Sequence, residues 1–169
     1  MTATITPSVA VAQAVVDAAE EPEFWTGRSG EPAPGELVAR HLEAVLALLE
    51  KRGWTPVRRS DETTAGLPDP DDDALSVKAM VRGLLRAVRD NFTDSGPVTF
   101  AGAWYRVDGG DNDARTVADR LLDEMVRART GHRSAFADAW ISKNGRTFDE
   151  VRDLLSTAAA FAREHGPRG

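Results

Sequence analysis

The chain has 169 residues, a formal net charge of −6 and no cysteine. That length is enough for one compact domain with a buried core, and the lack of cysteine excludes disulfides, thiolate zinc sites and a cysteine nucleophile. The N-terminus has no basic stretch followed by a hydrophobic core, and no apolar run approaches the roughly 18 residues that span a bilayer, so we expect a cytoplasmic protein with no membrane association.

The acidic residues are concentrated in two segments. Residues 1–35 carry a net charge of −4 and residues 61–73 carry −6, so the remainder of the chain is basic by +4. The basic residues are 18 Arg and only 3 Lys, a bias typical of high-GC bacterial coding. The total charge argues against a nucleic-acid partner, but the basic remainder keeps that class of partner open.

Residues 1–35 are rich in Ala, Pro and Glu. A short helix that begins at Val9 is predicted here, although its small side chains would bury little area. Phe24 and Trp25 are the large anchors of this stretch. We therefore expect a partly ordered extension over residues 1–35, docked through these two rings, and a helical domain over residues 36–166.

Residues 36–52 have the spacing of an amphipathic helix. Gly53 stands where a left-handed C-terminal cap is expected, and Pro56 prevents continuation of the helix. The apolar stripe that this helix would bury consists of Val38, Leu42, Val45 and Leu49.

The middle of the chain divides into a loop and a second helix. Residues 57–73 contain Gly, two Pro and clustered acids, which is typical of a loop, and an aspartate at position 72 or 73 then caps a helix over residues 74–92. Four basic side chains follow one face of this helix at spacings of four, four and three residues. This basic stripe consists of Lys78, Arg82, Arg86 and Arg89.

Residues 96–107 are the least helical part of the chain. Their β-branched and aromatic side chains alternate imperfectly and predict a short strand or an aromatic-anchored loop. A turn over residues 108–113 then caps a helix over residues 114–130, which Gly131 ends. A short helix over residues 133–141 follows, and its large apolar side chains are expected in the core, namely Phe136, Trp140 and Ile141.

The C-terminal segment has the clearest helix boundaries. Thr147 and Glu150 have the T-x-x-E spacing of a capping box, in which each side chain satisfies a backbone N–H at the start of a helix. Apolar residues then recur at helical spacing over residues 148–162. Gly166 and Pro167 end the helix, because Gly accepts the left-handed conformation and Pro cannot continue the hydrogen-bond ladder.

Together these elements predict a mainly α fold. We expect a compact bundle of about four main helices and one or two short ones, with at most a minor strand pair. Four Trp residues lie near the ends of the predicted elements, and aromatic residues at such positions favour core packing over a ligand pocket. These residues are Trp25, Trp54, Trp104 and Trp140.

No residue pattern identifies a catalytic or metal site. Acids crowd two loops, at residues 69–73 and 108–113, but both loops stand just before predicted helices, where carboxylates cap free N–H groups. His41, His132 and His165 show no H-x-x-x-H or E-x-x-H spacing, and we interpret His41 as a histidine at the edge of the core. No G-x-S-x-G elbow, Walker loop or dinucleotide-binding fingerprint occurs. We therefore assign no catalytic residue, no metal ligand and no cofactor.

The basic stripe has more than one interpretation. A solvated helix face is the simplest, and contact with phosphates or with an acidic partner is the alternative that gives it a function. A third interpretation is internal, in which the acidic segment 61–73 folds over the stripe. We name Lys78, Arg82, Arg86 and Arg89 as the candidate binding residues.

Two short motifs flank the helical domain. The first is R-G-W-T at residues 52–55, and the second is W-x-x-x-x-G-R-T at residues 140–147. Together they resemble a family of small actinobacterial domains of unknown function, family 6197. The second motif of that family usually reads W-N-D, whereas Ile141 and Ser142 stand here, so this chain lacks any site built on those polar residues. The resemblance implies a helical domain encoded in actinobacteria, including their mobile elements and phages, and it implies no activity.

These observations favour a non-enzymatic protein-interaction or regulatory module with an unidentified protein partner. A nucleic-acid-associated protein that acts through the basic stripe is the alternative, and a metal-dependent or small-molecule enzyme is the third choice. Arg146 is unexplained by local rules. We expect it to pair with Glu43 or Glu50 and so to tie the last helix to the first.

Overall fold

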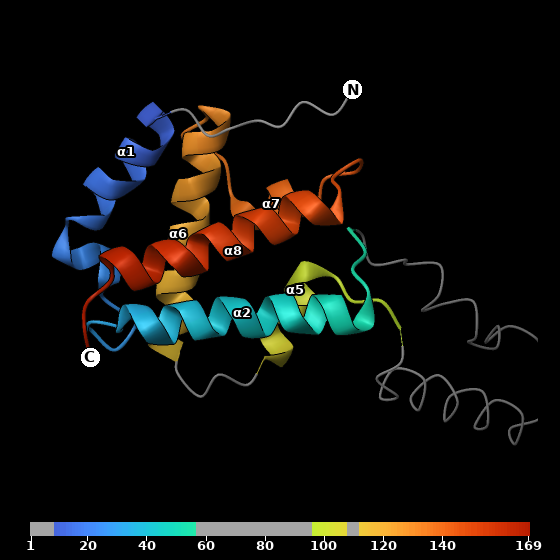
Figure 1. The fold of residues 1–169 in the computed structure, drawn as a ribbon, viewed down its shortest axis with the longest axis horizontal. Coiled ribbons are helices and arrows are strands. Elements are labelled where there is room, and N and C mark those ends of the chain that lie inside the picture. Colours follow the sequence, from blue (N-terminus) through green and yellow to red (C-terminus); the bar gives the residue numbers. More distant parts are fainter. Residues whose placement is uncertain (1–8, 57–95, 108–111) are drawn as a thin grey trace, which may run out of the picture.

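The computed structural model describes residues 9–56, 96–107 and 112–169. Over these ranges no strand forms, and β-type pairing is limited to two isolated bridges. The prediction of a mainly α, compact fold is confirmed. The helices, labelled as in Figure 1, are α1 (Val9–Ala19), α2 (Gly35–Arg52), α5 (Phe100–Arg106), α6 (Asn112–Thr130), α7 (Ala137–Ile141) and α8 (Phe148–His165), with a 3₁₀ turn η1 (Pro22–Trp25).

Helices α2 and α8 are the central pair of the fold. They lie side by side and run in opposite directions, and α6 crosses behind them (Figure 1). Their predicted apolar stripes are buried against each other, because residues three and four apart share one face of a helix. The buried side chains on this pair include Val38, Leu42, Val45, Leu49, Val151, Leu154, Leu155 and Ala158.

Helix α6 completes the core beneath this pair. It begins at Asn112, two residues before the predicted start, and it ends at Thr130. Gly131 follows with a φ of +70°, and the prediction that Gly131 ends this helix is confirmed. The side chains that α6 buries include Val117, Leu121, Leu122, Met125 and Val126.

Two glycines meet where α2 begins and α8 ends. The Gly35 N–H donates to the Pro167 carbonyl at 2.9 Å. A Cβ atom at Gly35 would lie 2.0 Å from the Ala162 carbonyl oxygen, and a Cβ atom at Gly166 would lie 2.4 Å from the Gly35 Cα. Gly166 has a φ of −74°, so the predicted left-handed cap is wrong. The position requires glycine because the two helix ends touch through their backbones.

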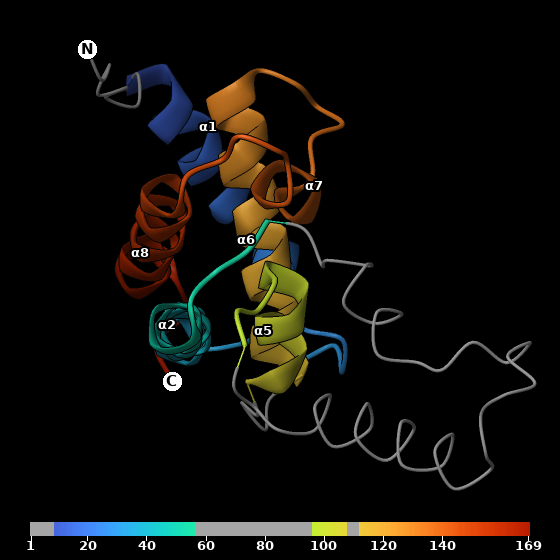
Figure 2. The same ribbon diagram turned by 90° about the vertical axis from the view of Figure 1, so that its right-hand side faces the viewer.

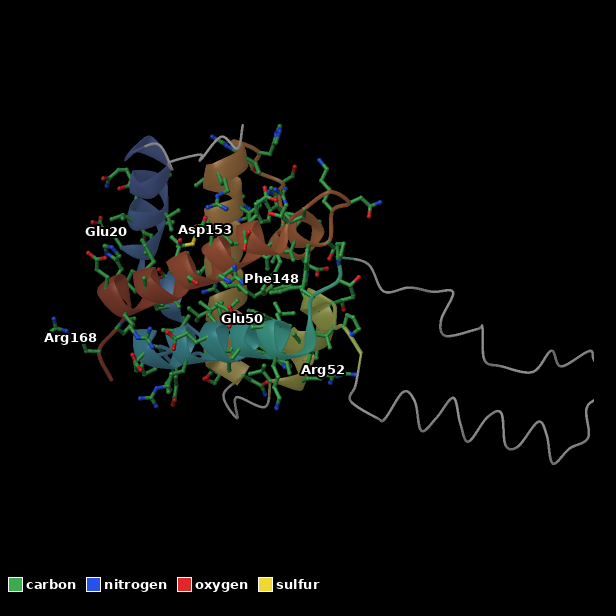
Figure 3. The ribbon with its side chains drawn as sticks, turned by 45° about the vertical axis from the view of Figure 1, so that its right-hand side comes forward. Glu20, Glu50, Arg52, Phe148, Asp153 and Arg168 are labelled. Atoms are coloured by element: carbon green, nitrogen blue, oxygen red, sulfur yellow. The ribbon has the colours of Figure 1, made fainter. Side chains whose placement is uncertain are left out.

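Charged side chains join the outer edges of α2 and α8. Arg163 donates to Glu36 at 2.9 Å and, from both Nη atoms, to Glu43 at 2.6 and 2.8 Å. Near the other end of the pair Arg152 donates to Glu50 at 3.1 Å, and Figure 3 labels Glu50 on α2 close to the start of α8. Because these side chains remain largely in solvent, they fix the register of the two helices more than they stabilise them.

The N-terminal segment lies on α6. Helix α1 contacts α6, and Phe24 and Trp25 in η1 are buried. Arg120 on α6 donates from one Nη atom to three backbone carbonyls of this segment, those of Glu23, Phe24 and Thr26, at 2.5–3.2 Å. A single guanidinium therefore holds the turn after α1 against the body of the fold.

The strand or loop predicted within residues 96–107 is wrong for most of this stretch. Helix α5 forms instead, and it begins where the Thr99 hydroxyl accepts a backbone N–H at 3.1 Å. Helical spacing turns Phe100 and Trp104 inward, where they are buried. The aromatic side chains that favoured a strand are thus satisfied by core contacts, which override local propensity.

Two backbone hydrogen bonds join the stretches of chain that flank residues 57–95. The Thr55 N–H donates to the Val98 carbonyl at 3.0 Å, and the Val98 N–H donates to the Gly53 carbonyl at 2.9 Å. They make an isolated parallel bridge between Trp54 and Val98. The loop predicted over residues 57–73 and the helix predicted over residues 74–92 lie outside the described residues.

Helix α7 is shorter than predicted and leaves Phe136 outside the core. Ile141 is buried as expected, and Trp140 is partly buried against the core. Phe136 stands at the N-cap with an extended backbone (φ −120°, ψ 141°) and is 56% exposed, so its expected place in the core is wrong. The cap conformation takes this side chain off the helical face that packs inward.

None of the helices in the described part of the chain combines the length and the apolar character that a membrane span requires.

Candidate functional site

The R-G-W-T motif closes the end of α2. Arg52 donates to the Gly96 carbonyl at 3.1 and 3.2 Å, and Gly53 has a φ of +81°. Trp54 stacks on Phe148 at the start of α8, with ring centroids 6.1 Å apart. This motif therefore builds the junction between α2, α8 and the chain that returns to α5.

The W-x-x-x-x-G-R-T motif builds the start of α8. The capping box of Thr147 and Glu150 is confirmed, with both reciprocal hydrogen bonds present. The Arg146 guanidinium lies over the Trp140 ring, its Cζ 3.5 Å from the ring centroid, and it donates to Glu150 at 2.6 Å. Gly145 has a φ of +86°, which explains its place in the turn.

The expected pairing of Arg146 with Glu43 or Glu50 is wrong. Glu43 accepts from Arg163 and Glu50 accepts from Arg152, both on α8. Sequence spacing does not distinguish these three arginines, because each lies within or beside the same helix. Of the residues that replace the family's usual Asn and Asp, Ile141 is fully buried and Ser142 ends α7.

The basic stripe remains a prediction. Lys78, Arg82, Arg86 and Arg89 all lie outside the described residues, and so do the acids at 69–73. Asp113 lies in the first turn of α6, where it accepts from the Ser29 backbone N–H at 2.9 Å and from the Ser29 hydroxyl. These hydrogen bonds hold the pKa of the Asp113 carboxyl below its ordinary value. Across the ranges that the structure covers, no three acid or histidine side chains gather in a way that suits a metal ion.

A surface built on α6 combines exposed aromatic rings with charges. Four charged residues recur on α6 at intervals of four and so follow one side of the helix. Helix α7 lies beside α6 and also contacts α5 (Figure 2). We call this surface the α6 face and define it as Tyr105, Arg115, Asp119, Asp123, Arg127, Phe136 and Asp138.

An exposed aromatic ring stands at each end of the α6 face. Tyr105 is 75% exposed and Phe136 is 56% exposed. The Arg115 guanidinium lies over the Tyr105 ring and the Arg127 guanidinium lies over the Phe136 ring, each with Cζ 5.7 Å from the ring centroid. Each arginine therefore makes a cation–π contact with an exposed ring.

Carboxylates occupy the middle of the α6 face. Asp123 accepts from the Ala137 N–H at 2.7 Å. The carboxylates of Asp119 and Asp138, by contrast, have no hydrogen-bond or ion-pair partner among the residues described. Although Asp119 keeps contact with solvent, partial burial raises the pKa of its carboxyl, and the nearby charges of Asp123 and Asp138 raise it further.

We expect Asp119→Asn to raise the stability of the folded protein at neutral pH. The raised pKa means that ionised Asp119 opposes folding, by less than about 1 kcal/mol after allowance for solvent screening. The gain should disappear as the pH falls towards the ordinary aspartate value of 3.8, where the unfolded chain is protonated too. Urea denaturation of both proteins at several pH values measures this difference.

Asp153→Asn is the matched control. Asp153 on α8 pairs with Arg129 at 2.6 Å, so its loss should not stabilise the protein. A lower stability of Asp119→Asn at neutral pH would contradict the electrostatic account of the α6 face.

Among the residues that the structure describes, His41 is the polar side chain that is buried. It is 5% exposed and neither ring nitrogen has a hydrogen-bond partner in that part of the chain, so the interpretation as a satisfied histidine at the edge of the core is wrong: His41 lies inside the core. Its ring meets the Trp104 ring edge to face, with centroids 4.7 Å apart. Burial lowers the pKa of the imidazole from its ordinary 6.5, and the charge of Arg115 lowers it further.

The sequence interpretation missed the α6 face. The four-residue spacing of Arg115, Asp119, Asp123 and Arg127 is visible in the sequence and signals one helix side. The sequence spacing does not indicate that Tyr105 and Phe136 are exposed, because their exposure depends on where α5 and α7 begin.

The chain folds into a small helical domain. Its R-G-W-T and W-x-x-x-x-G-R-T motifs build the end of α2 and the start of α8. The chain belongs to a family of unknown function (DUF6197), whose profile matches residues 33–161. The match runs through the middle of the chain, beyond the two end motifs on which the resemblance rested, and it leaves α1 and η1 outside. No curated protein and no solved structure matches the chain.

Proposed function

We propose that this protein is a non-enzymatic protein-interaction or regulatory module and that the α6 face is its docking surface. The observation that carries the proposal is the pair of exposed aromatic rings, Tyr105 and Phe136, each in cation–π contact with an arginine of α6. Tyr and Arg are enriched among the side chains that dominate the energy of protein interfaces. A ring that is already held by its neighbour loses less conformational entropy when a partner covers it.

The carboxylates between the two rings support the same proposal. Asp119 and Asp138 lack partners among the described residues, and ionised Asp119 opposes folding. Polar groups that cost stability are expected more often at functional positions than elsewhere on a surface. A partner with Lys or Arg side chains between two apolar contacts would pair these charges.

Site-specific crosslinking tests the proposal. A photoreactive phenylalanine analogue at position 105 or 136 should capture one and the same protein from the native host. The charge reversal Asp119→Lys with Asp138→Lys should abolish that capture, because it would place cations opposite the cations of the partner.

Position 37 provides the control for crosslinking. Leu37 on α2 is also an exposed apolar side chain, at 37%, but it lies outside the α6 face. Equal capture from position 37, or capture that the charge reversal leaves unchanged, would contradict the α6 face as the docking surface.

Nucleic-acid association through Lys78, Arg82, Arg86 and Arg89 is the alternative. It rests on the spacing of these residues in the sequence. It calls for binding to DNA or RNA that weakens steeply with salt and that is lost when all four residues are alanine. Those two results would favour the alternative over the α6 face.

A further inference from the structure

His41 is connected to Tyr105 through helix α5. His41 on α2 packs against Trp104, and Tyr105 is the next residue of α5. Trp104 is buried whereas Tyr105 is 75% exposed, so one ring faces the core and the other faces solvent. Any movement of α5 away from α2 therefore displaces the aromatic ring at one end of the α6 face.

The His41 ring is held in an apolar environment. Neither ring nitrogen has a hydrogen-bond partner among the described residues, and the side chain is 95% buried. Phe100 packs against Trp104 with ring centroids 5.2 Å apart, so aromatic surface extends beyond the contact with His41. A neutral imidazole is tolerated in such a place, but a charged one loses its hydration without gaining a carboxylate.

Within the described part of the chain, no charged group around His41 would stabilise the positive charge of a protonated imidazole. From α6 the neighbour is Arg115, whose charge disfavours a second cation. From α5 the neighbours of Trp104 are Tyr105 and Arg106, which supply no anion. The carboxylates on α2 are engaged elsewhere, since Glu36 and Glu43 accept from Arg163 of α8 and Glu50 accepts from Arg152. A cation–π contact with Trp104 would offset only part of this cost.

We propose that His41 is an acid-sensitive latch, whose protonation loosens α5 from α2 and displaces Tyr105 from the α6 face. Helix α5 is a short element of seven residues, and it meets His41 of α2 through Trp104, so loss of that contact weakens its hold on α2. The part that Tyr105 plays in docking rests on the proposed function, whereas the latch itself does not.

The direction of the pH dependence follows from the lowered pKa of His41. The unlatched state binds the proton more tightly, so acid favours it. The latched state is fully favoured above the ordinary histidine value of 6.5, and it is lost as the pH falls from there through the lowered value. Each unit by which the two values differ changes the ratio of latched to unlatched protein about tenfold.

The test uses the full chain without any partner. Nuclear magnetic resonance follows the ring signals of the three histidines, and amide hydrogen exchange reports on α5 between about pH 7.5 and about pH 5. We expect His41 to titrate below the ordinary histidine value of 6.5, and the α5 amides to lose protection by about tenfold or more over the same range, relative to α8.

Two variants separate the latch from general acid sensitivity. His41→Leu keeps an apolar side chain against Trp104, so α5 should stay protected at both pH values. His165→Gln removes an exposed histidine of α8 and should leave the response of the wild-type chain intact. If His41→Leu fails to fold, the wild-type protein decides: the midpoints of the His41 ring signals and of α5 exchange must coincide.

An ordinary titration of His41 with unchanged α5 protection would overturn the latch, as would an undiminished loss of protection in His41→Leu. Failure of the docking proposal gives a different pattern. Crosslinking through position 105 would then fail at neutral pH while the acid response of α5 persisted.

Discussion

Gly35→Ala is expected to lower the free energy of unfolding by about 3 kcal/mol or more. The added methyl carbon would lie 2.0 Å from the Ala162 carbonyl oxygen and 2.8 Å from the Gly166 Cα. Both are backbone atoms, so no side-chain rotation relieves the overlap, and the start of α2 must separate from the end of α8. A melting temperature lower by roughly 6–12 °C would accompany this loss in a chain of this length.

Gly96→Ala is the control for this substitution. Gly96 has open space around the position of a Cβ atom and no left-handed φ. Because its carbonyl still accepts from Arg52, its replacement should change stability little. A Gly35→Ala protein as stable as Gly96→Ala would show that the two helix ends do not meet as described.

Arg120→Met should release the N-terminal segment from α6. The side chain keeps its apolar stem but loses hydrogen bonds to three carbonyls, those of Glu23, Phe24 and Thr26. Because charged donors are worth more than neutral ones and the bonds to Phe24 and Thr26 are partly buried, we expect a loss of about 2–4 kcal/mol. Urea denaturation measures it, and limited proteolysis should then cut between α1 and α2 at a protease concentration that leaves the wild-type chain intact.

Arg133→Met is the comparison for Arg120→Met. Arg133 is exposed in the turn after α6, and no described residue pairs with it. If both variants are equally stable and equally resistant to protease, the carbonyl contacts of Arg120 do not hold the segment.

The helices with strong periodicity were predictable from the sequence. The capping box of Thr147 and Glu150 and the stripes of α2, α6 and α8 depend on residues close in the chain, and local rules describe such residues well. Helix α5 was missed because its aromatic residues have the propensity of a strand. Their helical placement follows from burial against α2, which no local window contains.

Positions that depend on contacts between distant residues were the least predictable. Gly166 was expected for its backbone conformation, whereas the structure places it against Gly35, far along the chain. Arg146 was expected to reach α2, whereas Arg163 and Arg152 do so. The α6 face has the same origin, since Tyr105 and Phe136 reach Arg115 and Arg127 only through tertiary packing.

The parallel bridge between Trp54 and Val98 limits how this chain can vary in length. Residues 57–95 leave and rejoin the fold at neighbouring points, so the cost of closing the intervening chain grows only slowly with its length. Longer versions of this segment are therefore compatible with unchanged positions of α2 and α5. Shortening has a lower bound, because two stretches that run in the same direction need a crossover of about a dozen residues and cannot be joined by a tight turn. The same bridge thus tolerates insertions at a small cost in closure entropy, and it tolerates deletions only while about a dozen residues remain between its two sides.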